Sequence, residues 1–272
     1  MDISILGCGW LGFPLAERLI SQGHRLKGST TTPKKMTLLN QSGIEPFLIK
    51  LPDDADNTDH DSFYDADIIV FNTPPGRKNP EAGAAYLESL KTVLWKADEY
   101  SISWIIFTSS TSVYSEFGGI TSEAQAKKGS ASSKTGELLL EAEEMVRESG
   151  IDYTILRLGG LYGYGRHPIH YLSGKKELGK GNKPVNLVHQ LDCVNIITEV
   201  VRQKKRNEIY NLVSDGHPPR SEFYRSAADH FNLPKPQFKP DSKTNYRIVS
   251  NQKLKEDLYY RFKYPNPMDH TP

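Results

Sequence analysis

Short apolar runs alternate with longer amphipathic segments along the first two-thirds of the chain. A short apolar run bounded by turn residues is typical of a buried strand, and apolar residues three or four positions apart are typical of a helix face. The predicted strands are 3–6, 25–30, 45–51, 67–72, 103–108 and 153–158, and the predicted helices are 11–22, 33–42, 81–100 and 136–149. Because alternating strands and helices form parallel sheets covered on both faces, this order predicts an α/β fold with a doubly wound parallel sheet.

The first predicted strand leads directly into a glycine-rich loop, Gly7-Cys8-Gly9-Trp10-Leu11-Gly12, and then into a helix. In this context the first glycine allows a tight turn, the second lets the backbone approach a pyrophosphate, and the third lets helix and strand pack closely. The helix N-terminus then holds the phosphates. A plain tight turn is the alternative. The loop predicts a Rossmann fold that binds NADP or NAD, with contacts from Gly7, Gly9, Trp10, Leu11 and Gly12.

The end of the second predicted strand indicates which dinucleotide is preferred. NAD-binding domains usually carry Asp or Glu there, to hold the ribose hydroxyls. This chain has Gly28-Ser29-Thr30-Thr31-Thr32-Pro33-Lys34-Lys35, without a carboxylate. Hydroxyls and lysines suit a 2′-phosphate, so we expect NADP in preference to NAD. The expected contacts are Thr30, Thr31, Thr32 and Lys34. The alternative is that Lys34 and Lys35 only begin a solvated helix.

The strand at 67–72 ends in Asn72-Thr73-Pro74-Pro75, at the carboxyl edge of the sheet where ligands of open α/β folds lie. We interpret these four residues as a wall against the adenosine ribose and phosphates; the alternative is a rigid turn. The acidic stretch between residues 53 and 61 lacks the glycine turn and the terminal glutamate of a calcium loop. We therefore interpret it as a solvated loop.

The pattern loosens after residue 163, where Gly, Pro and Lys dominate as far as residue 186. A helix at 193–202 and a strand at 209–213 are expected to return to the sheet, and one more helix is expected at 221–231. We therefore expect a Rossmann domain at 1–162, to which 188–213 returns. Residues 163–187 and 214–272 are expected to form a small C-terminal substrate-cap region.

Charge and cysteine content exclude several classes of protein. With 34 basic and 33 acidic residues among 272, the chain has no overall positive field for nucleic acid or an anionic membrane. No apolar run reaches the about 18 residues that span a bilayer, and the N-terminus lacks the features of a secretion signal. Two cysteines, Cys8 and Cys193, indicate a reducing, cytoplasmic setting and no zinc site. We expect a small-molecule substrate and a monomer or homodimer.

Three later segments add a family resemblance. The first is Ile106-Phe107-Thr108-Ser109-Ser110-Thr111-Ser112-Val113-Tyr114, the second is 153–163 with Gly165-Arg166, and the third is His189-Gln190-Leu191-Asp192. Together they resemble extended short-chain dehydrogenase/reductases, the epimerase/dehydratase group. The resemblance implies that Ser110 binds the substrate oxygen, that Ser109, Leu158 and Gly159 contact the cofactor, and that the third segment holds the cap against the Rossmann sheet. An acid–base pair of His189 and Asp192 is the alternative for that segment.

In that family a Tyr-x-x-x-Lys pair completes the site, with the tyrosine as acid–base group, and this chain lacks it. Counting back from Glu143 places Thr135 at the tyrosine position and Leu139 at the lysine position. Counting forward from Ser110 leads to Thr135 as well. A register slipped by five would instead align Ser130 and Lys134.

A threonine hydroxyl cannot replace a tyrosinate as a base near neutral pH, so any turnover needs another group. Lys134 is one candidate, and Tyr114, Tyr162, Tyr164 and His167 are others. Two functions remain open. One is an NAD(P)-dependent oxidoreductase or epimerase/dehydratase that acts on a small hydroxyl, carbonyl or sugar-nucleotide substrate. The other is a non-catalytic, NADP-binding redox sensor.

Overall fold

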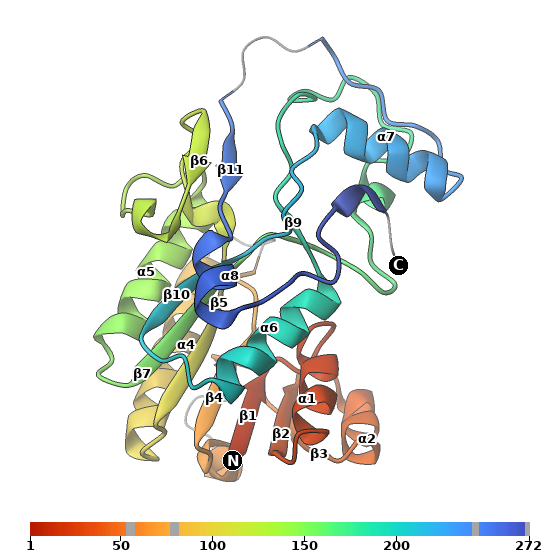
Figure 1. The fold of residues 1–272 in the computed structure, drawn as a ribbon. Coiled ribbons are helices and arrows are strands. Elements are labelled where there is room, and N and C mark those ends of the chain that lie inside the picture. Colours follow the sequence, from red (N-terminus) through yellow and green to blue (C-terminus); the bar gives the residue numbers. More distant parts are fainter. Residues whose placement is uncertain (53–57, 77–81, 241–244, 270–272) are drawn as a thin grey trace. The chain divides into compact units, whose positions relative to one another are not determined.

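The structure is a computed structural model that describes residues 1–52, 58–76, 82–240 and 245–269. A seven-stranded sheet runs through it in the order β10-β7-β5-β4-β1-β2-β3 (Figure 1). Strand β1 pairs in parallel with β2 and with β4, β2 pairs in parallel with β3, and β4 with β5. The predicted doubly wound α/β fold is confirmed. No helix in the described ranges is long and apolar enough to cross a membrane.

The elements up to β5 follow the order that the sequence pattern predicts, except for one short helix at Asp61–Tyr64, which it does not predict. They are β1 (Asp2–Leu6), α1 (Gly12–Ile20), β2 (Arg25–Thr30), α2 (Pro33–Gln41), β3 (Ile44–Leu48), α3 (Asp61–Tyr64), β4 (Ile68–Phe71), α4 (Ala82–Glu99) and β5 (Trp104–Ser110). Glu81, the predicted first residue of α4, lies outside the described residues. So do Asp53, Asp54 and Asp56 of the stretch interpreted as a solvated loop; the later part of that stretch includes a 3-10 turn (Thr58–His60).

The later elements comprise both elements that the pattern predicts and short ones that it does not. They are β6 (Gly119–Thr121), α5 (Lys134–Glu148), β7 (Asp152–Leu158), β8 (Gly160–Tyr162), β9 (Leu187–His189), α6 (Gln190–Arg202), β10 (Glu208–Leu212), α7 (Arg220–His230), β11 (Arg247–Val249) and α8 (Gln252–Leu258). Strands β6 and β11 pair in parallel, as do β8 and β9. Three-residue strands and a seven-residue helix are too short to leave a readable hydrophobic period.

The chain divides into two compact units. Unit 1 consists of 1–109, 133–156 and 197–209, and unit 2 consists of 110–132, 157–196 and 210–272. The sequence pattern predicts a different division, with a domain boundary after residue 162, and that boundary stays a prediction.

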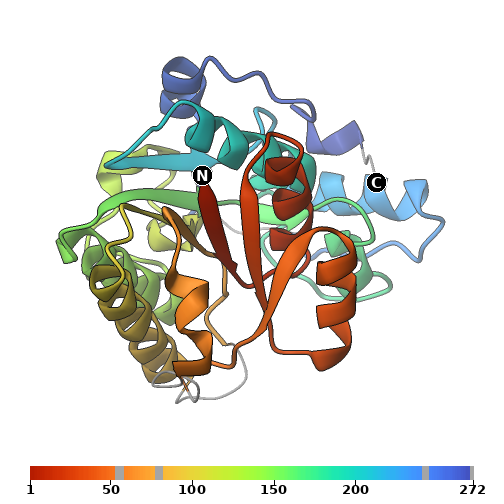
Figure 2. The same ribbon diagram turned by 90° about the horizontal axis from the view of Figure 1, so that it is seen from below.

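Unit 1 is a layered α/β body. Helices α4 and α5 pack side by side on one face of the sheet, and α1 lies on the opposite face (Figure 2). Helix α1 buries Leu15, Ala16 and Leu19, which are spaced as one helix face. The β4 strand is buried on both sides, since all its residues, Ile68 to Phe71, are apolar and buried. Both faces of the sheet are therefore covered, and its carboxyl edge is left to carry loops.

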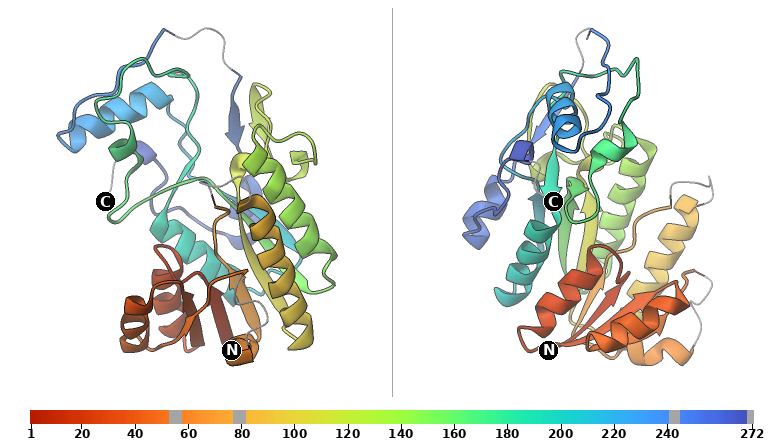
Figure 3. Two further views of the ribbon diagram at one scale, coloured as in Figure 1. Left: turned by 180° about the vertical axis from the view of Figure 1, so that it is seen from behind. Right: turned by 90° about the vertical axis from the view of Figure 1, so that its right-hand side faces the viewer.

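Unit 2 consists of short elements around aromatic clusters. Helix α7 packs against the turn at Pro168–Tyr171, with Ile169, Ala227 and Ala228 fully buried between them (Figure 3). A second cluster joins Tyr162, Leu187 and Phe223. Small clusters of large side chains thus hold the part of the chain whose sequence pattern is weakest.

Candidate functional site

The glycine-rich loop follows β1 and is compact because two of its glycines are sterically required. Gly7 has φ +95°, and a Cβ there would lie 2.8 Å from the Asn72 carbonyl oxygen. A Cβ on Gly12, the first residue of α1, would lie 2.4 Å from the Gly7 carbonyl oxygen. Any side chain at either position would force strand and helix apart.

Hydrogen bonds from neighbouring strands hold the loop in this shape. Ser29 of β2 accepts from the Gly7 amide at its side-chain oxygen (2.9 Å) and from the Cys8 amide at its carbonyl oxygen (2.8 Å). Asn72, which follows β4, donates its side-chain amide to the Gly7 carbonyl oxygen at 2.9 Å. The sequence interpretation of Asn72 as part of a ligand wall missed this role in supporting the loop.

Gly9 differs from the other two glycines. A Cβ built on Gly9 meets no protein atom within 4 Å. The space beside it belongs to a cavity of about 440 Å³ that Gly9 lines. The space beside Gly9 is therefore open to a ligand that approaches the backbone. Helix α1 begins beside this space, and its N-cap Leu11 provides no side-chain cap, which suits a phosphate.

The cavity extends from the glycine-rich loop to the ends of β2, β3 and β4 and to one face of α4, all within unit 1. Its lining residues in the described part of the chain are Leu6, Gly7, Cys8, Gly9, Ser29, Thr30, Thr31, Thr32, Lys35, Ile49, Leu51, Asn72, Thr73, Pro74, Gly76, Ala82, Ala85, Tyr86 and Ser89. Apolar walls beyond a phosphate-binding loop suit an adenosine group. The residues therefore fit the adenosine and pyrophosphate part of a nicotinamide dinucleotide.

The end of this cavity beside β2, where a bound dinucleotide would place its adenosine ribose, carries hydroxyls and one cation. Thr30, Thr31, Thr32 and Lys35 line it, and no carboxylate is among its lining residues in the described ranges. The Thr30 side-chain oxygen accepts from the Thr32 amide at 3.2 Å, which shapes the turn into α2. Lys35, rather than the expected Lys34, contributes to the wall.

The other predicted cofactor contacts lie outside the lining. Leu11 and Gly12 begin α1, and Trp10, Lys34 and Pro75 are adjacent to lining residues in sequence. Ser109 donates its hydroxyl to Glu143 at 2.5 Å in the interior of unit 1. Leu158 and Gly159 belong to unit 2, where a Cβ on Gly159 would lie 2.9 Å from the Asn186 carbonyl oxygen.

Sequence reasoning missed the contribution of α4. Ala82, Ala85, Tyr86 and Ser89 follow the spacing of one helix face and line the cavity. The signal was present, since three of the four are small residues that leave room on that face. The same spacing is also typical of an ordinary packing face, so the sequence alone does not distinguish a cavity wall from a packed one.

The predicted catalytic residues lie at the ends of two elements. Ser110 is the last residue of β5 and belongs to unit 2, and its side-chain oxygen accepts from the Ser112 amide at 3.1 Å. Lys134 and Thr135 are exposed in the first turn of α5, in unit 1. Ser133 caps that helix by accepting from the Gly136 amide at 3.1 Å. Lys134 and Thr135 thus follow a capped helix start.

The alignment that places Thr135 at the family's tyrosine position puts the lysine position at residue 139, and this residue of α5 is not a lysine. Leu139 is there, with 2% of its surface exposed. Glu143, one turn later, is buried and receives the hydroxyl of Ser109 on β5. The hydrogen bond from Ser109 satisfies this buried carboxylate and ties α5 to β5.

Three alternative acid–base candidates are buried. Tyr114 accepts from Arg157 at 2.8 Å and donates to the Asn211 side-chain oxygen at 2.7 Å. Burial raises the pKa of Tyr114 to about 12 despite the neighbouring Arg157. Tyr162 is fully buried, and burial also raises its pKa. His167 is 5% exposed and stacks on Phe223. Tyr164, the fourth of these aromatic candidates, is exposed and lies beside His189.

His189 and Asp192 both have structural contacts within unit 2. The buried Asp192 carboxylate accepts from the Tyr260 hydroxyl (2.7 Å) and from the amides of Lys263 (2.8 Å) and Tyr264 (3.0 Å). The Tyr264 ring lies 3.8 Å from the His189 ring, centre to centre. The segment therefore anchors residues 260–264 within unit 2. No group of three or more His, Cys, Asp or Glu residues in the described ranges could hold a metal ion.

Unit 2 contains a second cavity, of about 420 Å³, that the sequence did not indicate. Its lining residues in the described part of the chain are Thr111, Lys180, Lys183, Pro184, Val185, Asn186, Leu187, Arg220, Tyr224 and Arg247. Four of these ten residues are cations and none is an anion. Such a wall favours an anionic ligand.

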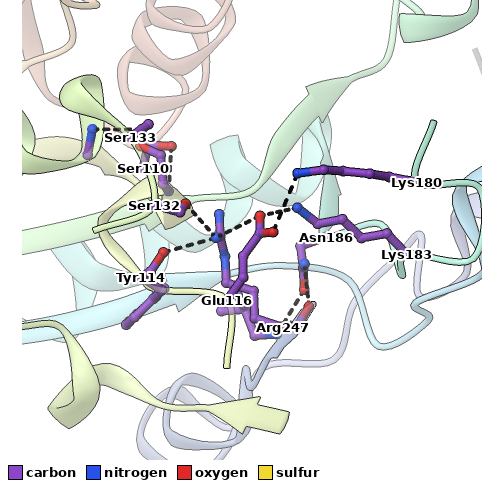
Figure 4. Close-up of polar contacts among 12 residues, drawn as sticks. Ser110, Tyr114, Glu116, Ser132, Ser133, Lys180, Lys183, Asn186 and Arg247 are labelled. Atoms are coloured by element: carbon purple, nitrogen blue, oxygen red, sulfur yellow. Dashed lines mark hydrogen bonds and ion pairs between the residues drawn. The ribbon is translucent and has the colours of Figure 1, made fainter. Parts of the chain in front are cut away.

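Glu116 lies between three of these cations (Figure 4). Its carboxylate contacts the Lys183 ammonium, lies 3.8 Å from that of Lys180, and accepts from Arg247 at 3.5 Å. Burial favours the protonated form of Glu116, but Lys183, Lys180 and Arg247 together hold its pKa below the ordinary value. Glu116 is therefore charged at neutral pH.

Known proteins that resemble this chain identify its family. The family model described as NAD(P)H-binding matches residues 7–187. Protein YeeZ of Escherichia coli (strain K12) is 34% identical over 270 residues, which cover 98% of this chain and 97% of that protein.

Two solved structures show the likeness of fold. UDP-glucose 4-epimerase from Thermotoga maritima, solved with UDP-glucose, matches 97% of this chain and 94% of its own at a TM-score of 0.79 and 19% identity. A short-chain dehydrogenase/reductase superfamily protein from Agrobacterium tumefaciens with bound NAD matches 99% and 95% at a TM-score of 0.77 and 17% identity. The chain therefore belongs to the NAD(P)H-binding family and has the Rossmann fold of epimerases and short-chain dehydrogenase/reductases.

Proposed function

We propose that the protein is an NADP-preferring oxidoreductase or epimerase that acts on a sugar nucleotide or a similar anionic hydroxyl or carbonyl compound. The observation that carries the proposal is the cationic cavity of unit 2, which accompanies a dinucleotide cavity in unit 1. A protein that only binds a dinucleotide does not need a second cavity with four cations.

The preference for NADP rests on the ribose end of the first cavity. A 2′-phosphate needs donors and positive charge, and the hydroxyls of Thr30, Thr31 and Thr32 and the ammonium of Lys35 provide both. A carboxylate in the same place would repel the phosphate.

The proposed substrate class rests on charge. Unit 2 contains 18 basic and 11 acidic residues, a net charge of +7, whereas unit 1 contains 16 basic and 22 acidic residues, a net charge of −6. The near-zero charge of the whole chain conceals this difference. A positive unit with a cationic cavity attracts an anionic substrate, and the Thermotoga maritima epimerase was solved with UDP-glucose.

We assign the chemical roles as follows. The dinucleotide, when bound, accepts or returns a hydride. Ser110 hydrogen-bonds the reacting substrate oxygen, and Thr135 contributes a second neutral hydroxyl. Neither can act as a base at neutral pH, so water accepts the substrate proton on oxidation, and the Lys134 ammonium is a donor that can return a proton when a carbonyl is reduced. Unit 2 serves as the substrate part of the molecule.

The test incubates the purified protein with NAD or NADP and a panel of UDP-, GDP- and dTDP-sugars. Absorbance at 340 nm detects net oxidation, and NMR detects epimers, which form without net change of the cofactor. Turnover of at least one sugar nucleotide, lost in Ser110→Ala, is the expected result. Sugar nucleotides that neither bind nor react would overturn the proposal.

A second function has one specific observation in its favour. Leu139 is buried where the family resemblance implies a lysine, so α5 offers no cation to a neighbouring acid–base group at that position. A non-catalytic, NADP-binding redox sensor needs none. Binding of NADP without turnover of any sugar nucleotide would favour it.

A further inference from the structure

Glu116 contacts three cations that all line the cavity of unit 2, but it is not itself a lining residue. Its side chain is 17% exposed. The carboxylate therefore stands behind the cationic wall. We propose that Glu116 is a positioning residue that holds Lys180, Lys183 and Arg247 in place for a pyrophosphate group. This inference rests on the proposed function, because it names how the same cavity recognises its ligand.

The three cations come from two separate segments. Lys180 and Lys183 belong to the loop before β9, and Arg247 begins β11. Like charges repel, and lysine side chains lose much rotamer freedom when they are fixed. A shared carboxylate offsets both effects by giving the cations one common acceptor (Figure 4).

Arg247 shows how firmly the cluster is built. Its guanidinium donates to the Tyr114 carbonyl oxygen at 2.9 Å and to the Ser132 hydroxyl at 3.1 Å, besides Glu116. The Asn186 side chain accepts from the Val249 amide at 2.8 Å and donates to the Arg247 carbonyl oxygen at 3.1 Å, which fixes β11 beside the cavity. Burial lowers the pKa of Arg247, and Glu116 opposes that effect.

Arg220, the fourth cation, is held without a carboxylate. It donates to the Gly179 carbonyl oxygen at 2.6 Å, and its guanidinium lies 5.7 Å and 5.4 Å from the ring centres of Tyr224 and Phe238. With Glu116 included, the cluster of four cations keeps a net charge of +3. Donors in several directions and this excess of charge suit two linked phosphates better than a single carboxylate.

Two explanations of the role of Glu116, an effect of its charge alone and a positioning role, predict opposite changes in anion affinity for Glu116→Gln. Removal of a negative charge should tighten the binding of any anion if charge alone matters. If Glu116 positions the cations, the same change should weaken binding, because the lysines must then be ordered by the ligand. The matched control is Glu177→Gln, which removes an exposed carboxylate of unit 2 paired with Lys239 at 2.9 Å.

The experiment is calorimetric titration of the full-length protein with inorganic pyrophosphate, in saturating NAD so that the glycine-rich loop is occupied. Arg247→Met should abolish binding and so locate it in the cavity. Glu116→Gln should lower the pyrophosphate affinity by at least about tenfold, with partial recovery in Glu116→Asp and no change in Glu177→Gln. NAD affinity, which reports on unit 1, should stay constant in every variant, and circular dichroism should show that each variant is folded.

The outcomes separate the two proposals. If wild type binds pyrophosphate, Arg247→Met does not, and Glu116→Gln binds as tightly as wild type or more tightly, the positioning role is wrong and the proposed function stands. If wild type binds NAD but not pyrophosphate, the anionic substrate class fails and this inference fails with it.

Discussion

The three glycines of the first loop are glycines for different physical reasons. Gly7 and Gly12 have backbone atoms of the protein where a Cβ would be, whereas Gly9 faces open space in the cavity. Substitution of the first two should therefore disturb the fold, and substitution of Gly9 should disturb only the ligand.

We predict that Gly9→Asp abolishes dinucleotide binding and leaves the free energy of unfolding within about 1 kcal/mol of wild type. A carboxylate beside the pyrophosphate repels it, at a cost of several kcal/mol, so the affinity should fall by more than about 100-fold. Calorimetry and urea unfolding measure the two quantities. Gly179→Ala, also a substitution into open space, is the control. Unchanged NADP affinity in folded Gly9→Asp would contradict the assignment of the site.

The choice between NADP and NAD also belongs to single residues. We predict that Lys35→Ala weakens NADP binding by about 1–3 kcal/mol and leaves NAD binding unchanged, since only NADP has the charged 2′-phosphate. Lys34→Ala, whose side chain is exposed outside the lining, should change neither. Thr30→Asp should reverse the preference toward NAD. Tighter binding of NAD than of NADP by the wild type would show that the preference is misassigned.

At the scale of the element, α5 separates the two functional hypotheses. Thr135 is exposed in its first turn and Leu139 is buried one turn later. We predict that Thr135→Tyr combined with Leu139→Lys raises carbonyl reduction by roughly 10²- to 10⁴-fold, the usual contribution of general acid–base catalysis. Stopped assays of NADPH oxidation with simple aldehydes measure the rate.

Thr135→Tyr alone is the control for this α5 variant and should gain less, because no lysine supports the tyrosinate. Leu139→Lys buries a charge and should lower the melting temperature. A folded, NADP-binding double variant with the wild-type rate would mean that the register is slipped, as in the alignment of Ser130 and Lys134.

The first turn of α6 carries the anchor of the C-terminal segment. Asp192 accepts three hydrogen bonds from residues 260–264 while fully buried. We predict that Asp192→Asn lowers the free energy of unfolding by about 2–4 kcal/mol, since the amide keeps one acceptor oxygen and adds donors without acceptors. Denaturant unfolding measures the loss.

The control for Asp192 is Asp229→Asn. Asp229 pairs with Lys235 at 2.7 Å on the surface, with 62% of its side chain exposed. An exposed pair contributes less than about 1 kcal/mol. Equal losses from the two variants would show that Asp192 is not an anchor.

At the scale of the whole molecule, the uneven charge of the two units is the main feature. We predict that UDP-glucose affinity falls by about tenfold between about 50 mM and about 500 mM NaCl, because the cations of unit 2 are screened. NAD affinity should fall less, since backbone amides and the α1 N-terminus hold its phosphates. Titrations of both ligands over the same salt series test this. Equal salt dependence would contradict the placement of the two ligands in different units.

The sequence by itself determined the strands of the main sheet, the helices between them and the glycine-rich loop. Each depends on local information. Buried strands such as Ile68–Phe71 are continuous apolar runs, α1 shows one apolar face, and Gly7 and Gly12 meet a packing requirement of any strand–loop–helix unit. The cofactor class follows from these elements because parallel strands bring their carboxyl ends to one edge.

Only the tertiary structure decided which cations share a cavity and how they are held. Glu116, the pair Lys180 and Lys183, and Arg247 come from three segments that are far apart along the chain. Each is an ordinary surface charge when read in sequence. Likewise, the structure and not the spacing selected Lys35 over Lys34 and identified Asn72 as a support of the loop. Local periodicity records which face of an element is buried, but long-range contacts arise only when distant elements pack, and the cationic cavity consists of such contacts.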